Sequence, residues 1–249
     1  TAVEIPAKIA GKPVTSVGRS AFSGCNSLAA VTIPDSVTRI GLDAFYKCNS
    51  LTTITMPDGV TILGANAFSF CTSLTEVTMP NSLTSIGSNA FSGCSSLTEI
   101  EIPDSVTSIG ESAFSDCKKL TSITIPDSVT NIEKSAFSGC NNLTIYGYAR
   151  SYAQKYAAEN NIRFALIGGL PRGDVDGSGG IDSTDIFYTM LYIANVAVGN
   201  DGGLTAEQIA AADVDGNGTV DSTDSFYIMY YVALHGAGIH QTWEEILAK

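Results

Sequence analysis

The dipeptide Ala-Phe occurs six times in the first part of the chain, and each occurrence follows the last by 23 residues. The phenylalanines are Phe22, Phe45, Phe68, Phe91, Phe114 and Phe137. Proline recurs at the same interval at Pro34, Pro57, Pro80, Pro103 and Pro126. The first repeat departs from this period, because Pro6 precedes Pro34 by 28 residues and five residues are inserted around 10–13. A fixed period of this length predicts a repeat architecture.

One full repeat, Ala90–Ser112, carries apolar residues at fixed positions. Within it, Ile100 and Ile102 alternate with polar residues directly before Pro103. This pattern predicts a short strand that ends at the proline, because proline cannot donate to a ladder. A single repeat cannot bury its own apolar face, whereas stacked repeats share a continuous core. We therefore expect a mostly β solenoid of 23-residue repeats with short parallel strands.

The outward positions of these strands are small or acidic, and they include the row Glu76, Glu99 and Glu101. We interpret this row as a solvated face, and the alternative is a binding surface for a basic patch of a partner protein. Glycan-binding platforms usually use exposed aromatic side chains. Only Tyr46 and Phe70 fall outside the buried pattern of the repeats.

Each repeat also carries one cysteine. The six residues are Cys25, Cys48, Cys71, Cys94, Cys117 and Cys140. An even number of cysteines in a secreted protein is compatible with disulfides, but pairing alternate repeats would break the regularity of the stack. We expect buried thiols that behave as small hydrophobic groups. A metal site is disfavoured because no histidine accompanies any of these cysteines.

The motif AFSGCxSLTxIxIPDSVTxIG, present in six successive copies, resembles the BspA-type leucine-rich repeats of bacterial surface proteins. The segment Leu143–Ile167 resembles the usual terminus of that family. Its spacing predicts a helix over Ser151–Asn160 and a last strand over Ile162–Ile167. We assign 1–146 to the leucine-rich-repeat solenoid and 147–168 to its C-terminal cap. Members of the family often act in adhesion or protein contact, so the resemblance implies a further protein ligand on the solenoid.

Two twelve-residue segments, DVDGSGGIDSTD at Asp174–Asp185 and DVDGNGTVDSTD at Asp213–Asp224, have the spacing of calcium loops. Gly179 and Gly218 occupy position 6, where such a loop turns sharply. Four carboxylates in each loop suit a hard cation, so we expect two calcium ions as cofactors. The predicted ligands are Asp174, Asp176, Ser178, Gly180 (through its carbonyl), Asp182, Asp185, Asp213, Asp215, Asn217, Thr219 (through its carbonyl), Asp221 and Asp224.

An exiting helix is expected after each loop, over Ser183–Ala194 and Ser222–Leu234, and a further helix over Leu204–Ala212. The stretch 169–173 is rich in glycine and proline and is predicted to be a linker. It stands where the first loop of an EF-hand would have its entering helix. The region after it is therefore expected to be a small all-α domain of two loop-helix units.

Two loop-helix units without the first entering helix resemble a type I dockerin, the module that attaches cellulosomal proteins to a scaffoldin. The resemblance covers Gly173–Ile239, and we assign 174–240 to the dockerin and 241–249 to a C-terminal tail. It implies that a cohesin module of a scaffoldin is the partner. The implied cohesin-binding residues are Ser183, Thr184, Met190, Leu191, Ser222, Thr223, Met229 and Tyr230.

Both kinds of contact residue have a simpler interpretation, which is core packing for the apolar ones and ordinary helix N-terminal positions for Ser and Thr. The two halves match at Ser-Thr, which leads to the hypothesis that the module docks on a cohesin in two orientations. Because the carboxylates in each loop repel one another, we also expect calcium binding to be coupled to folding.

The net charge of −12 is concentrated in 171–249, where 12 acidic residues face 2 basic ones. This balance disfavours nucleic acid as a partner. No apolar run approaches the roughly 18–20 residues that span a bilayer. We expect a secreted protein, present as a mature or trimmed fragment and attached to a bacterial cell-surface cellulosome.

No motif of a catalytic site is present, and both histidines, His235 and His240, stand near the end of the chain without a nucleophile. We therefore expect a non-catalytic cellulosome or cell-surface component. One alternative is a secreted, calcium-stabilised adhesin that binds no cohesin. Another is a fragment of a larger cellulosomal hydrolase.

Overall fold

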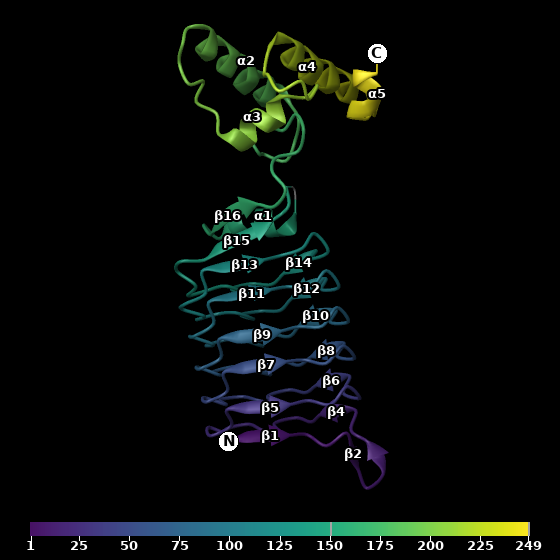
Figure 1. Cartoon of the computed structure of the whole chain (residues 1–249), viewed down its shortest axis with the longest axis vertical. Coiled ribbons are helices and arrows are strands. Elements are labelled where there is room, and N and C mark those ends of the chain that lie inside the picture. Colours follow the sequence, from purple (N-terminus) through teal and green to yellow (C-terminus); the bar gives the residue numbers. More distant parts are fainter. Residues whose placement is uncertain (150, 249) are drawn as a thin grey trace. The chain divides into compact units, whose positions relative to one another are not determined.

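The computed structural model describes residues 1–149 and 151–248. Arg150, within the predicted cap, and Lys249, within the predicted tail, lie outside the described residues. The chain divides into two compact units, Thr1–Ala165 and Leu166–Lys249, which are described separately (Figure 1).

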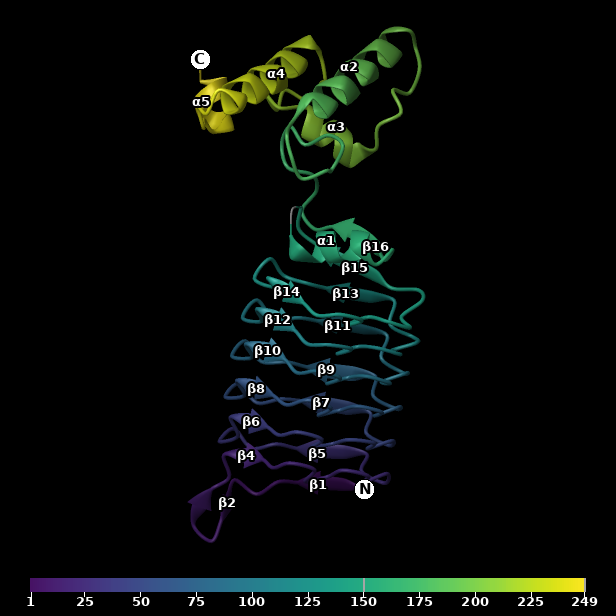
Figure 2. The same ribbon diagram turned by 180° about the vertical axis from the view of Figure 1, so that it is seen from behind.

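The first unit is a β-solenoid whose turns each contribute two short strands on two faces, visible from both sides in Figures 1 and 2. One face is a six-stranded parallel sheet. Its strands are β4 (Ser16–Val17), β6 (Arg39–Ile40), β8 (Ile62–Leu63), β10 (Ser85–Ile86), β12 (Ser108–Ile109) and β14 (Asn131–Ile132). The other face carries β1 (Ala2–Glu4), β5 (Ala30–Thr32), β7 (Thr53–Thr55), β9 (Glu76–Thr78), β11 (Glu99–Glu101), β13 (Ser122–Thr124) and β15 (Thr144–Gly147). The predicted solenoid with short parallel strands is confirmed.

In the six-stranded sheet, neighbouring turns pair in a register of one 23-residue repeat, and so do β7 with β9 and β11 with β13. Ile100 in β11 pairs with Ile123 in β13, so equivalent side chains lie directly above one another. The strand β11 ends before Pro103, as predicted from the missing amide of proline. The turns also approach closely at a recurring glycine, because a Cβ on Gly110 would lie 2.6 Å from the backbone nitrogen of Ser88.

The five-residue insertion of the first repeat forms an antiparallel hairpin of β2 (Lys8–Ile9) and β3 (Lys12–Pro13). The two residues between the strands, Ala10 and Gly11, both have positive φ, 50° and 77°. This is the backbone of a tight hairpin turn whose twist matches the twist of the strands. The insertion therefore leaves the stacking of the first repeat on the next intact.

The repeated phenylalanines form a ladder through the core. From Phe22 to Phe137, successive rings are nearly parallel, with centroids 5.1–5.4 Å apart. The ladder ends against Tyr156, whose ring meets Phe137 edge-on at 5.9 Å. Four of the rings, from Phe45 to Phe114, are fully buried. The constant 23-residue spacing of the phenylalanines thus produces a continuous apolar column in the core.

The cysteines form a second column, and none of them is in a disulfide. From Cys48 onwards each thiol donates to a phenylalanine carbonyl of the preceding turn, as in Cys94 Sγ to Phe68 O at 3.2 Å. Burial raises the pKa of Cys94 to about 12, which keeps this thiol protonated. The prediction of buried thiols is confirmed for five of the six. It is wrong for Cys25, which is exposed in the first repeat.

The solenoid ends in the predicted helix, α1 (Tyr152–Glu159), and in the strand β16 (Arg163–Leu166), which extends the sheet next to β15. Ser151 caps the helix, because its hydroxyl accepts from the amide of Gln154 at 3.2 Å. Ala153, Tyr156 and Ala157 face the core. The α1 helix thereby covers the apolar surface of the last turn.

The second unit is helical. Its helices are α2 (Ser183–Ala197), α3 (Ala206–Ala212), α4 (Ser222–Gly236) and α5 (Trp243–Leu247). The three predicted helices are confirmed, and the region expected as a tail contains α5. The buried core is small and centres on Val175, Val214 and Ile228, with Trp243 packed against it. No helix in the described part of the chain is both long and apolar enough to cross a membrane.

Candidate functional site

Each acidic loop starts the helix that follows it. Asp182, at loop position 9, is the N-cap of α2, and its carboxylate accepts from the amide of Thr184 at 2.7 Å. Asp185 reaches back and accepts from the amide of Asp182 at 2.8 Å, which completes a capping box. Asp221 and Asp224 repeat this arrangement at the start of α4. The hydrogen bonds from the backbone amides of Thr184 and Thr223 lower the pKa of Asp182 and Asp221, respectively.

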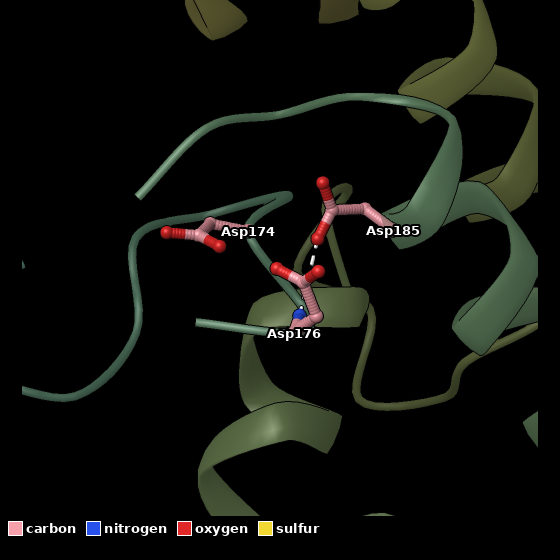
Figure 3. A group of neighbouring side chains, drawn as sticks. All are labelled: Asp174, Asp176 and Asp185. Carbon is pink, nitrogen blue, oxygen red and sulfur yellow. Dashed lines mark hydrogen bonds between the residues drawn. The ribbon is translucent and has the colours of Figure 1, made fainter. Parts of the chain in front are cut away.

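The carboxylates at loop positions 1, 3 and 12 come together. Asp174, Asp176 and Asp185 each offer an oxygen, and these oxygens lie within 4.8 Å of one another (Figure 3). The second loop brings Asp213, Asp215 and Asp224 together in the same way. Two separate acidic clusters therefore result from the two repeated segments.

Burial distinguishes the members of each cluster. Asp174, Asp185 and Asp224 have no exposed surface. Burial raises the pKa of the Asp185 and Asp224 carboxyl groups, and the nearby charges of Asp176 and Asp215 raise it further. A cation placed among these oxygens would remove both penalties on the ionised carboxylates.

Backbone amides hold the buried carboxylates in place. Asp185 Oδ1 accepts from the amides of Val175 and Asp176 at 2.7 and 3.1 Å. Asp174 Oδ2 accepts from the amide of Gly179 at 3.0 Å, at the point where the loop turns. Gly179 has a φ of 87°, and the equivalent Gly218 has a φ of 88°. The predicted sharp turn at position 6 is thus present in both loops.

The remaining predicted ligands lie in the same turns. The Ser178 hydroxyl is 3.4 Å from the carbonyl of Gly180, and the Asn217 side-chain oxygen accepts from the amide of Thr219 at 2.8 Å. Asp182 and Asp221 are outside the carboxylate clusters and act as helix caps. The donors of both loops are oxygens, with no thiol or imidazole among them, which is the chemistry that a hard cation such as calcium prefers. Both acidic clusters are consistent with calcium sites.

The predicted cohesin-binding residues lie on α2 and α4 and at the starts of these helices. Ser183, Thr184, Ser222 and Thr223 are exposed in the first turns. Met190, Leu191 and Met229 are 43–57% exposed, and Tyr230 is half-buried and stacks on Phe226 with centroids 6.1 Å apart. Core packing therefore does not account for the two methionines.

A groove of about 380 Å³ runs between α2 and α4, and its wall is almost entirely apolar. Met190, Met229 and Ser222 line it together with Phe226, which is 54% exposed. Phe187 on α2 is also 59% exposed. Sequence reasoning missed these two phenylalanines, although they occupy the same position after each loop, which is the signal that would have found them.

The family model of the BspA type leucine rich repeat region matches residues 15–144 in six copies. The chain belongs to this family. A dockerin type I domain follows and matches residues 172–233. Leucine-rich repeats are protein-interaction modules and dockerins bind cohesins, and neither of these two families is catalytic.

Solved structures similar to this chain include a leucine rich repeat protein of T. pallidum, with 35% identity and a TM-score of 0.58. The match covers 66% of this chain and 85% of that protein. A leucine rich cell surface protein of Faecalibacterium prausnitzii has 28% identity and a TM-score of 0.42, with coverage of 63% and 62%. A leucine-rich repeat protein of Eubacterium ventriosum has 28% identity and a TM-score of 0.47, with coverage of 56% and 40%. No curated protein matches the chain.

Proposed function

We propose that this protein is a non-catalytic component that attaches to a cohesin of a bacterial scaffoldin and presents its solenoid as an interaction module. The observation that carries the proposal is the pair of loop-helix units, each with an acidic cluster and an exposed apolar helix face. The proposed parts are the solenoid over 1–146, its cap over 147–168, a linker over 169–173, the dockerin over 174–240 and a tail over 241–249.

Each loop is proposed to bind one calcium ion. The ligands proposed in the first loop are Asp174, Asp176, Ser178, Gly180, Asp182 and Asp185. Those proposed in the second are Asp213, Asp215, Asn217, Thr219, Asp221 and Asp224. Calcium supplies the positive charge that lets crowded carboxylates stay ionised. Asp182 and Asp221 cap their helices, so we expect them to take part through a water molecule, as position 9 often does in EF-hand loops.

The cohesin is proposed to contact α2 and α4. Neither helix contains a lysine or an arginine, so the contact depends on apolar burial and on hydrogen bonds from hydroxyl groups rather than on charge. The proposed contact residues are Ser183, Thr184, Met190, Leu191, Ser222, Thr223, Met229 and Tyr230. Exposed apolar surface of this kind is costly in water unless a partner covers it.

The experiment is calorimetric titration of the intact chain with a panel of bacterial cohesins, first with calcium and then with excess chelator. Binding in calcium that disappears with chelator is the expected result. A chain that binds calcium but no cohesin would contradict the proposal and favour a calcium-stabilised adhesin.

The two-orientation hypothesis is tested on the same titration. Replacing Ser183 and Thr184 by alanine is expected to leave cohesin binding nearly intact, because the second Ser-Thr pair remains available. Replacing Ser222 and Thr223 as well is expected to weaken binding strongly. Loss of binding with the first pair alone would contradict two equivalent orientations.

A protein ligand is also proposed for the solenoid. The acidic strand face holds a hollow of about 370 Å³ lined by Glu76, Glu99, Glu101, Ser122 and Thr124, among others. Such a face fits a basic patch of a partner protein. The proposed location is outside the cell, at a bacterial surface, where free calcium is abundant and cohesins are displayed. Because the proposed calcium ligands lie in the dockerin, chelation is expected to weaken attachment to cohesin and to leave ligand binding at the acidic face unchanged.

A further inference from the structure

An exposed phenylalanine occupies a strained backbone position on the solenoid. Phe70 has a φ of +58° and its side chain is 43% exposed. The equivalent position in three other repeats is glycine, at Gly24, Gly93 and Gly139, with φ between 72° and 80°. A bulky side chain in this left-handed region is an outlier that persists only where something compensates for it. The burial that stabilises the repeats cannot explain it, because Phe70 lies outside the buried core.

The neighbouring turns accommodate this ring. A Cβ on Gly93 would lie 2.6 Å from Cδ1 of Phe70, so the ring rests against the glycine of the next turn. The ring of half-buried Tyr46 also meets Phe70 edge-on, with centroids 6.0 Å apart and an interplanar angle of 88°. Phe70 and Tyr46 therefore form a fixed aromatic surface rather than a loose side chain.

The ammonium group of Lys47 lies next to the same aromatic surface. Lys47 Nζ lies 5.0 Å from the centroid of Tyr46 and 6.0 Å from that of Phe70. Lys47 also has a left-handed backbone, with a φ of 58°. Within residues 1–149 and 151–248 no ion pair involves this lysine, so no carboxylate of the described chain competes with a ligand for its charge. The three side chains combine an apolar face with one positive charge.

We propose that Tyr46, Lys47 and Phe70 form a binding site for a carboxylate-bearing glycan, such as a chain of uronic acid residues. The C–H face of a pyranose ring packs on an aromatic face, whose negative π-density attracts polarised C–H groups, and the carboxylate of the same residue pairs with Lys47. A protein partner is disfavoured, because a specific protein interface buries about 800 Å² on each side and needs several apolar anchors. Two rings and one cation match a single sugar.

The test is calorimetric titration of the full chain with hexagalacturonate at physiological salt, where a Debye length of about 8 Å screens the acidity of the rest of the chain. The methyl ester of the same oligosaccharide has the same rings without the charge. Phe70→Gly is expected to weaken binding about tenfold or more, and Lys47→Met about threefold, to the level of the ester. Asp116→Gly is the matched control, since Asp116 has a φ of 56° at the equivalent position of another repeat.

Phe70→Gly separates binding from stability, because it removes backbone strain. The expected result is weaker binding with an unchanged or higher thermal midpoint. If this variant unfolds, Lys47→Met decides, because it keeps both rings. No binding of hexagalacturonate, equal binding by wild type and both variants, or preferential binding of poly-glutamate over the sugar would each overturn the proposal.

Discussion

Removal of calcium is expected to unfold the C-terminal unit while the solenoid stays folded. The core of this unit is small, with Val175, Val214 and Ile228 at its centre. Two clusters of three carboxylates add mutual repulsion within 4.8 Å in each loop. The solenoid has a continuous column of buried rings within a core of hydrophobic side chains. The two units should therefore respond differently to a chelator.

The size of the effect follows from binding linkage. At free calcium about 1,000-fold above the dissociation constant, each site stabilises the folded state by about 4 kcal/mol, so two sites contribute about 8 kcal/mol. The whole net stability of a typical domain is about 5–15 kcal/mol. Removing one site with Asp224→Asn should cost about 4 kcal/mol. Glu207→Gln removes one negative charge outside both loops and is expected to change little.

The assay is the fluorescence of Trp243, because it is the single tryptophan of the chain. Its ring stacks on Tyr231 with centroids 4.6 Å apart, and its indole N–H donates to the carbonyl of Arg172 at 2.9 Å. Unfolding of the C-terminal unit should shift its fluorescence to longer wavelength as chelator is added. The solenoid is followed by its thermal transition in far-UV circular dichroism. Unchanged tryptophan emission and unchanged helical signal in excess chelator would refute the reasoning.

Three further predictions concern the solenoid. Phe91→Ala should lower the free energy of unfolding in urea by about 4–5 kcal/mol, more than Phe22→Ala, because Phe91 is stacked on both sides. Thiol titration of the native protein should detect Cys25 rapidly and the five buried thiols only after unfolding. Gly110→Ala should cost about 2 kcal/mol through contact with the backbone of the preceding turn. Gly18→Ala, with open space around it, should stay within about 0.5 kcal/mol in the same urea assay.

The solenoid could be predicted almost completely from its sequence. A shift of one repeat places Ile100 on Ile123, so the fold follows from the period and from a single pairing rule. The rule fails where the repetition stops. Cys25 has a local sequence similar to that of the buried cysteines, yet it is exposed in the first repeat. Burial of a residue in a repeat depends on the neighbouring repeats, which its own motif does not describe.

The acidic loops were predictable to a lesser depth. Spacing identified the carboxylates that come together at positions 1, 3 and 12, because the ligands of such a loop lie within one short segment. It did not show that Asp182 caps α2, since ligand and cap are the same residue type at the same place. The contact of Trp243 with Arg172 spans 71 residues. No local pattern predicts a contact over this separation. The contact fixes the start of α5, so part of the expected tail is a packed helix.

The two units are expected to differ in what stabilises them, which is ring packing in the solenoid and the acidic loops in the C-terminal unit. In the solenoid, each fully buried ring from Phe45 to Phe114 packs against the turns on both sides. The surfaces that we propose for ligand binding on the solenoid are therefore expected to stay folded without a cation. In the C-terminal unit, the starts of α2 and α4 depend on Asp182, Asp185, Asp221 and Asp224, which belong to the acidic loops. Loss of calcium would therefore disorder the helix faces proposed to contact cohesin before it affected Phe70 or the acidic strand face. If the proposed function is right, attachment to cohesin should be lost in chelator, whereas ligand binding by the solenoid should persist.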